Sequence, residues 1–172
     1  KQVNIESKGA ISIRELFVNS LRMRPDRIII GEVRGDEALD MIQAISSGHS
    51  GSLAIVHAAS PEDCFNRLVT MILMSGIRLA TEEIKKQIAH ALDLIVHVEL
   101  FPDGVRRITY VTDLEYDPKE MDPYMNHVFH FEQEKVSEDG RIIGNWVMSK
   151  KKPSFYPKLV KRNAELPAGF FE

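Results

Sequence analysis

The sequence has little cysteine and no long hydrophobic run, and each absence excludes a class of protein. Cys64 is the one cysteine among 172 residues, so no disulfide can form within the chain, and a reducing compartment suits it. The longest apolar stretch, residues 68–74, contains a threonine and is far shorter than the ~20 residues that cross a bilayer. The start of the chain has no signal-peptide pattern. We therefore expect a cytoplasmic chain that meets a membrane only through partners.

The chain also lacks a strong excess of either charge. It holds 22 Lys and Arg against 25 Asp and Glu, for a net charge of −3, so we predict no nucleic-acid binding. Hydrophobic residues make up 44% and charged residues 27% of the sequence, which is typical of a globular protein. A chain of this length can bury one core. We expect a single folded domain over residues 1–172.

A run of isoleucines leads into an acidic residue. Ile28, Ile29 and Ile30 form a β-branched run that is typical of a parallel strand covered on both faces, and we predict a strand over residues 27–32. Glu32 stands at the carboxyl end of this strand, with Arg34 two residues further on. Such an acid can carry chemistry, pair with Arg34 or cap the next helix.

A second apolar run leads into a histidine. Gly48 and Gly51 bracket a loop before a strand predicted over residues 52–57, which ends on His57. Ligands of open α/β sheets bind outside the carboxyl ends of the strands. We therefore expect two parallel strands that carry Glu32 and His57 to one sheet edge. A carboxylate and an imidazole placed in this way look like half of a nucleotide hydrolysis site.

Helix signals flank both strands. Ser12-Ile-Arg-Glu15 is a capping box that predicts a helix ending before Pro25. Ser60-Pro61 predicts a second helix start, with that helix running to about Met74. Apolar residues at helical spacing predict further helices over about 36–46 and 81–91. The alternation of strands and helices indicates an α/β fold with a mostly parallel sheet.

The pattern changes after residue 93. Strand-like runs at 94–100 and 107–112 are joined by a Pro-Asp-Gly turn at 102–104, and runs at 128–132 and 142–148 are predicted to pair across residues 138–140. We expect these antiparallel strands to extend the parallel sheet, with an exposed loop over residues 118–123. Residues 150–172 are rich in lysine. This basic tail is either a solvated surface or a docking surface for another protein.

The two strand-end motifs resemble those of the secretion ATPase superfamily, the hexameric motors of type II and type IV secretion and type IV pilus systems. The Walker B motif of that family, Arg-x-x-Pro-Asp-x-Ile-x-x-Gly-Glu-x-Arg, is matched by Arg22, Pro25, Asp26, Ile28, Gly31, Glu32 and Arg34. Its His box, Gly-His-x-Gly-Ser-Leu-x-x-x-His-Ala, is matched by Gly48, His49, Gly51, Ser52, Leu53, His57 and Ala58. The Tad-type (tight adherence) pilus ATPases look most similar, and the resemblance is strongest over about residues 5–115.

The resemblance implies a partial RecA-like P-loop NTPase domain, with antiparallel strands after the α/β part. In this interpretation residues 1–93 hold the Walker B motif and the His box, residues 94–149 hold the strand extension, and residues 150–172 form the tail. The resemblance also implies that the intact protein is a homo-hexamer that hydrolyses ATP with Mg²⁺ and works with a membrane platform protein.

One element of such enzymes is missing from this chain. No Gly-x-x-x-x-Gly-Lys-[Ser/Thr] loop occurs in the 172 residues, and that loop supplies the backbone N–H groups and the lysine that hold the phosphates. We therefore interpret the chain as the C-terminal part of a longer ATPase and expect it to be inactive by itself. The alternative is a non-catalytic module that docks on a secretion machine.

The family also implies roles for individual residues. Glu32 is expected to polarise the attacking water and to order Mg²⁺ through water, and His57 to sense or stabilise the γ-phosphate. Gly31, Arg34 and His49 complete the expected nucleotide-binding set. Without the family, His57 reads as a structural histidine. His49 is either a nucleotide contact or a residue that shapes its loop or touches a neighbouring subunit.

Two further sets of residues stay open to more than one interpretation. Three arginines can face phosphate, act across a subunit boundary, or form ion pairs with nearby acids; they are Arg22, Arg24 and Arg34, and the acids are Asp26, Asp36 and Glu37. A zinc site is disfavoured, because the candidate ligands lack the close pairs typical of such sites; they are His49, His57, Asp63 and Cys64.

Overall fold

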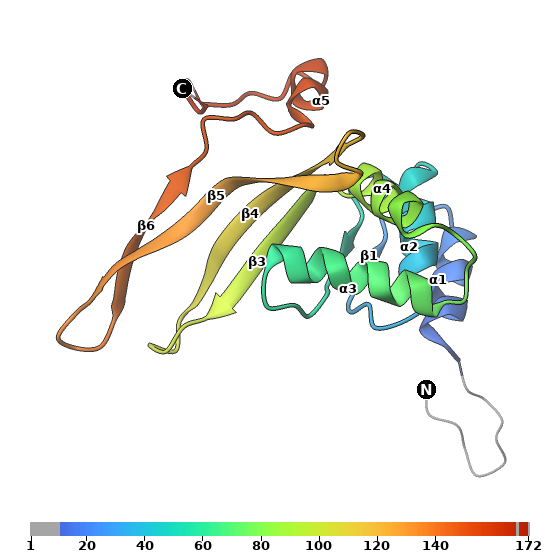
Figure 1. The fold of residues 1–172 in the computed structure, drawn as a ribbon, viewed down its shortest axis with the longest axis horizontal. Coiled ribbons are helices and arrows are strands. Elements are labelled where there is room, and N and C mark those ends of the chain that lie inside the picture. The colour runs from blue at the N-terminus through green and yellow to red at the C-terminus, as the bar shows by residue number, and fades with distance from the viewer. Residues whose placement is uncertain (1–10, 168, 172) are drawn as a thin grey trace, which may run out of the picture. The chain divides into compact units, whose positions relative to one another are not determined.

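A computed structural model describes residues 11–167 and 169–171, which form two compact units (Figure 1). The first, the α/β unit, takes in the described residues up to Ala59 and those of Asp63–Ala91. The second, the antiparallel unit, takes in Ser60–Glu62 and the described residues from Leu92 onward. None of the helices in the described part of the chain is long and apolar enough to cross a membrane.

The α/β unit alternates helices and short strands. In chain order its elements are α1 (Ile13–Leu21), β1 (Ile29–Ile30), α2 (Glu37–Ser46), β2 (Leu53–Ala54), α3 (Pro61–Met74, which begins in the antiparallel unit) and α4 (Thr81–Ala91). β1 and β2 pair in parallel, with Ile29 opposite Leu53. This confirms the predicted parallel pair. Both strands are shorter than predicted, although single backbone hydrogen bonds continue on either side of the two-residue ladder.

Helices cover one face of this two-stranded sheet. Ile28 and Ile30 are buried, and they line one small internal space together with Phe17 of α1 and Met41 of α2. Successive side chains of a strand point to opposite faces. Ile29 accordingly lies on the other side, where it is 75% exposed. The predicted coverage of both faces is therefore wrong for the described residues, because α1 and α2 bury only one of them.

Local signals place the helix starts as predicted. The Ser12 hydroxyl accepts a hydrogen bond from the Glu15 backbone N–H at 3.1 Å, and the Glu15 carboxylate accepts one from the Ser12 N–H at 2.7 Å. This is the predicted capping box. α3 begins at Pro61, whose fixed φ and missing N–H suit a first helical position.

The antiparallel unit is a four-stranded meander. Its strands are β3 (Leu94–Leu100), β4 (Arg106–Asp117), β5 (Asp122–Val136) and β6 (Ile142–Met148), in that spatial order, and α5 (Tyr156–Lys161) follows them. The predicted hairpins are present, and Gly104 and Gly140 take the positive φ that such turns require. β4 and β5 extend well beyond the predicted runs at 107–112 and 128–132, so only a turn over residues 118–121 remains of the loop predicted at 118–123.

The prediction that these strands extend the parallel sheet is wrong. Among the described residues, β3 to β6 pair as strands only with one another and form a sheet of their own. The physical reason is that each strand pairs with the strand next to it in the chain, so three hairpin pairings are made locally. Local pairing of this kind needs no strand from another sheet.

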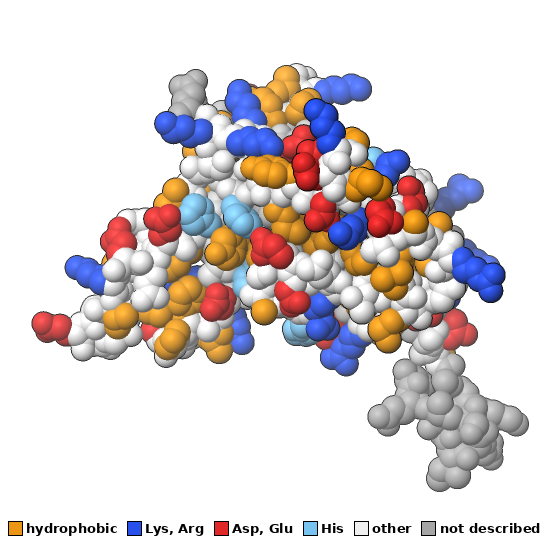
Figure 2. Space-filling view, in the orientation of Figure 1, with side chains coloured by type: hydrophobic (Ala, Val, Ile, Leu, Met, Phe, Trp, Pro, Cys, Tyr) orange, Lys and Arg blue, Asp and Glu red, His pale blue; other side chains and the backbone are white. Residues whose placement is uncertain are grey.

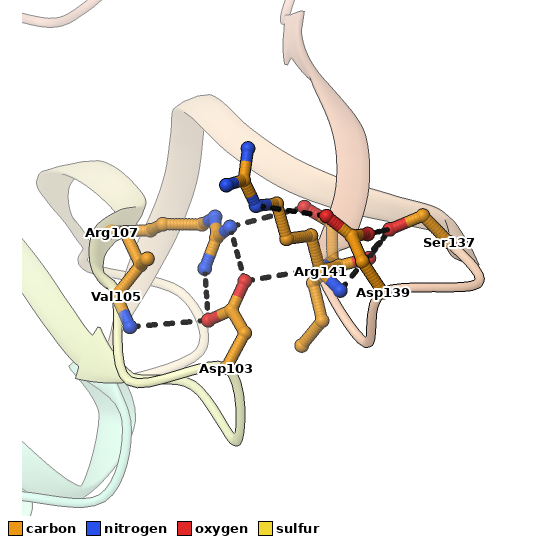
Figure 3. Close-up of polar contacts among 7 residues, drawn as sticks. Asp103, Val105, Arg107, Ser137, Asp139 and Arg141 are labelled. Carbon is orange, nitrogen blue, oxygen red and sulfur yellow. Dashed lines mark hydrogen bonds and ion pairs between the residues drawn. The ribbon is translucent and has the colours of Figure 1, made fainter.

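A buried carboxylate ties the first hairpin turn to the last strand (Figure 3). Asp103 accepts two hydrogen bonds from the Arg107 guanidinium, at 2.9 and 2.7 Å, and one from the Ile142 backbone N–H at 3.0 Å. These bonds hold the pKa of Asp103 far below its usual range. Because Ile142 begins β6, the contact joins elements that are not neighbours in the sheet.

Candidate functional site

The site lies where the chain leaves β1 and β2. Glu32 follows β1 and His57 follows β2, so both stand at the carboxyl ends of paired parallel strands. Nε2 of His57 is 2.9 Å from Oε1 of Glu32. Nη2 of Arg34 is 2.6 Å from Oε2 of the same carboxylate. The prediction that Glu32 and His57 meet at one sheet edge is confirmed.

The backbone sets this convergence. Hydrogen bonds continue beyond the two strands, from the Leu53 N–H to the Ile28 carbonyl at 2.9 Å and from the Val33 N–H to the Ile55 carbonyl at 2.9 Å. These bonds hold the residues on either side of Glu32 against the second strand. The carboxylate therefore emerges next to the segment that carries His57.

The three side chains differ in exposure. The Glu32 side chain is 26% exposed, whereas those of Arg34 and His57 are 71% and 77% exposed. The hydrogen bond from Arg34 is the largest influence on the pKa of Glu32 and lowers it, against the opposing effect of burial. Glu32 is thus an ionised carboxylate at neutral pH, and two exposed partners flank it.

The donor chemistry of Glu32 suits a magnesium ion held partly by a nucleotide. Mg²⁺ prefers oxygen ligands and usually takes one or two carboxylates together with substrate phosphates and water. Glu32 Oε1 is a buried atom that lacks a well-aligned hydrogen bond, so it has acceptor capacity to spare. In the described ranges, no three His, Cys, Asp or Glu residues are grouped so that they could hold a metal by themselves.

The candidate zinc ligands named from the sequence include one thiol, Cys64. The described residues offer no metal-binding cluster that contains His49, His57, Asp63 and Cys64. Burial, with a smaller contribution from Asp63, raises the pKa of the Cys64 thiol to about 11. Because zinc binds the thiolate, a thiol that stays protonated is a poor ligand.

Two further predicted site residues, Gly31 and His49, lie in the loops next to β1 and β2. Gly31 directly precedes Glu32, and a Cβ built on it meets nothing within 4 Å. His49 lies in the loop between α2 and β2, where its Nδ1 is 3.3 Å from the Ala44 carbonyl. Ser52 ties this loop to β1, because its hydroxyl donates to the His49 carbonyl and accepts from the Ile28 N–H. This geometry supports the loop-shaping interpretation of His49.

The structure also settles which acid the Arg34 side chain meets. Arg34 pairs with Glu32, and it is Arg14 of α1 that contacts Asp36 and Asp40, at 3.5 and 2.7 Å.

Glu37 is a candidate functional residue that the sequence analysis considered only as an ion-pair partner of an arginine. Its buried side chain accepts hydrogen bonds from the backbone N–H groups of Arg34 and Gly35. An acid at the first position of the helix that follows the Glu32 motif is a signal that could have found it.

Lysines of the tail take part in local pairs. Lys and Arg side chains gather around α5 and the segment before it (Figure 2, top). Lys151 Nζ lies 3.0 Å from Glu115, Lys158 Nζ lies 2.7 Å from Asp93, and Lys152 Nζ lies 4.7 Å from the centre of the Tyr156 ring. These contacts support a structural use of the tail, as a charged surface folded onto the antiparallel unit.

Known proteins are similar to this chain in sequence. A putative conjugal transfer protein of Mycobacterium tuberculosis is 35% identical over 114 residues, which cover 66% of this chain and 32% of that protein. The type IV secretion system protein VirB11 of Brucella suis is 37% identical over 116 residues, which cover 66% of this chain and 32% of that protein. The chain thus spans about a third of the length of these relatives.

A solved structure and a family profile agree with these matches. The crystal structure of the VirB11 ATPase from the Brucella suis type IV secretion system, in complex with sulphate, matches with a TM-score of 0.56 at 38% identity, over 64% of this chain and 33% of that one. The profile of the type II/IV secretion system protein family matches residues 1–123, which include Glu32, Arg34 and His57. The chain belongs to the type II/IV secretion system protein family.

Proposed function

We propose that this chain is the C-terminal segment of an ATPase that hydrolyses Mg-ATP to power type II/IV secretion or the assembly of a Tad-type pilus. One observation carries the proposal: Glu32 and His57 converge to 2.9 Å at the carboxyl edge of two parallel strands. Relatives named as secretion system proteins, one of them an ATPase, support it. The active form is a homo-hexamer at the cytoplasmic side of the membrane, docked on a platform protein.

Each residue of the site has a task in this chemistry. Phosphoryl transfer needs mainly positioning and charge stabilisation. Glu32, kept ionised by Arg34, orients the attacking water through a hydrogen bond and holds Mg²⁺ through water. When bound, Mg²⁺ neutralises charge on the phosphates. His57, exposed and adjacent to Glu32, donates a hydrogen bond to a phosphate oxygen and so registers whether that phosphate is present.

Arg34 and the two remaining predicted residues assist. The guanidinium of Arg34 holds Oε2 of Glu32, so Oε1, which lies beside His57, is the oxygen that would contact water. Because the Arg34 side chain is 71% exposed, it can also turn toward a bound phosphate. Gly31 leaves open space next to Glu32, and His49 keeps the loop before β2 in shape.

A second candidate function is a non-catalytic module that docks on a secretion machine. The observation in its favour is that these 172 residues contain no Gly-x-x-x-x-Gly-Lys-[Ser/Thr] loop. The sequence encoded upstream of Lys1 separates the two candidates. A phosphate-binding loop there favours the motor, and its absence favours the module.

The test of the ATPase proposal uses the full-length gene product. Glu32→Gln removes the negative charge but keeps the size of the side chain. We expect it to lower kcat by about 10²-fold or more and to leave nucleotide binding nearly intact, because the carboxylate acts mostly in the transition state. Glu83→Gln is a matched control, because Glu83 is a half-exposed acid on α4 away from this loop. Wild-type turnover by Glu32→Gln would refute the proposal.

A further inference from the structure

Glu37 is a charged residue in an unusual place. It is the first residue of α2 and is only 5% exposed. A buried carboxylate is costly unless hydrogen-bond donors satisfy it. Oε1 of Glu37 accepts from the backbone N–H groups of Arg34 at 2.7 Å and Gly35 at 3.2 Å. Both donors belong to the loop that leaves the Glu32 site.

These bonds differ from ordinary helix capping. A helix-capping side chain accepts hydrogen bonds from N–H groups inside the first turn of its own helix. Glu37 reaches back to two residues that precede the helix. Asp36 is the N-cap residue, and its side chain makes no capping hydrogen bond. The Glu37 carboxylate therefore holds the loop in place.

A short chain of contacts connects Glu37 to the carboxylate of Glu32. α2 is anchored in the core through Ala38 and Ile42, which are at most 1% exposed. Glu37 thus stands on a rigid element and binds the backbone N–H of Arg34. The side chain of Arg34 in turn contacts the Glu32 carboxylate at 2.6 Å. A Cβ on Gly35 would lie 3.3 Å from Oε2 of Glu37, so the glycine leaves the carboxylate room to approach.

We propose that Glu37 is a positioning residue of the hydrolysis site, which fixes the backbone of Arg34 and thereby the orientation of the Glu32 carboxylate. This inference rests on the proposed ATPase function. Without the two acceptor bonds, the Arg34 and Gly35 N–H groups lose their partner and the loop can relax toward water. Arg34 then no longer holds Glu32 in one orientation, and a small misplacement of a catalytic group slows the reaction strongly.

The experiment compares variants of the full-length gene product in steady-state ATP hydrolysis. Glu37→Ala removes the acceptor, and we expect kcat to fall about 10-fold or more while KM stays within about twofold. Glu37→Gln retains a carbonyl oxygen in the same position and should recover most of the activity. Asp36→Asn removes one negative charge from the same helix end without touching the loop bonds, and it should behave like the wild type.

Gly35→Ala provides an independent variant in case Glu37→Ala does not fold, which circular dichroism would show. The added methyl group displaces the Glu37 carboxylate by a few tenths of an ångström and should lower kcat with KM unchanged. Wild-type kcat in folded Glu37→Ala, or in Gly35→Ala if the former does not fold, overturns the inference. The same ATPase assay includes Glu32→Gln, which separates this inference from the proposed function. If Glu32→Gln is inactive, the proposed function stands even when Glu37→Ala has wild-type kcat. If Glu32→Gln is fully active, the proposed function itself fails.

Discussion

Nε2 of His57 lies 2.9 Å from Oε1 of Glu32, although helix α2 and strand β2 lie between these residues in the chain. They meet because β1 and β2 pair directly, with Ile30 opposite Ala54. A shift of this pairing by one residue would turn the side chains of one strand to the other face of the sheet. The register of two very short strands therefore sets the distance on which the proposed chemistry depends.

The 172-residue chain by itself should not hydrolyse ATP and should bind it with an affinity no better than about millimolar. The loop that supplies most of the phosphate contacts is not in its sequence. Isothermal titration calorimetry and a coupled ATPase assay on the purified chain measure both quantities. Steady turnover that Glu32→Gln abolishes would contradict this prediction.

His57→Ala should slow the full-length protein by about 10- to 100-fold, a milder effect than that of Glu32→Gln. A hydrogen bond to a charged group contributes about 1.5–3 kcal/mol, and about 1.4 kcal/mol corresponds to a factor of ten in rate. The measurement is kcat, with nucleotide binding determined separately on the same variant. His57→Gln keeps a side-chain N–H donor and serves as the matched comparison. Equal kcat for the wild type and His57→Ala would show that His57 is structural.

Asp103→Asn should destabilise the chain at neutral pH, and the difference from the wild type should shrink in acid. The pKa of Asp103 is lowered in the folded state, so its stabilising effect is present above the ordinary carboxyl pKa of about 4 and is lost as pH falls through the folded value. Urea unfolding followed by the fluorescence of Trp146 reports the midpoint at each pH.

Asp139→Asn is the control for this experiment. Asp139 pairs with Arg141, but the two side chains are 59% and 79% exposed, and exposed pairs contribute little to stability (Figure 3). A shift of the urea midpoint as large as that of Asp103→Asn would show that burial of the Asp103 contacts is not what makes them stabilising.

Cys64 should react slowly with thiol reagents at pH 8 while the chain is folded. Its pKa of about 11 keeps the thiol protonated, and only the thiolate is a strong nucleophile. Labelling by a chromogenic disulfide should be at least roughly 10-fold faster in urea, where the thiol regains an ordinary pKa. Equally fast labelling of the folded chain would mean that Cys64 is neither buried nor shifted.

Several features could be predicted from the sequence because neighbouring residues decide them. The capping box at Ser12 and Glu15 involves residues three positions apart, and the start of α3 at Pro61 follows from the geometry of one residue. The hairpin turns at Gly104 and Gly140 depend on a single positive φ each. In the same way, two contiguous motifs predict Glu32 and His57 as site residues.

Other features depended on which distant groups came together. Several acids lie close to Arg34 in the sequence. In the folded loop the side chain of Arg34 pairs with Glu32, and its backbone N–H donates to Glu37. The separate antiparallel sheet and the bond from Ile142 to Asp103 likewise join residues far apart in sequence. Local residue preferences determine where helices, turns and motifs begin. The choice of partner for a charged or strand residue depends on packing, because burial and distance exist only in the tertiary structure.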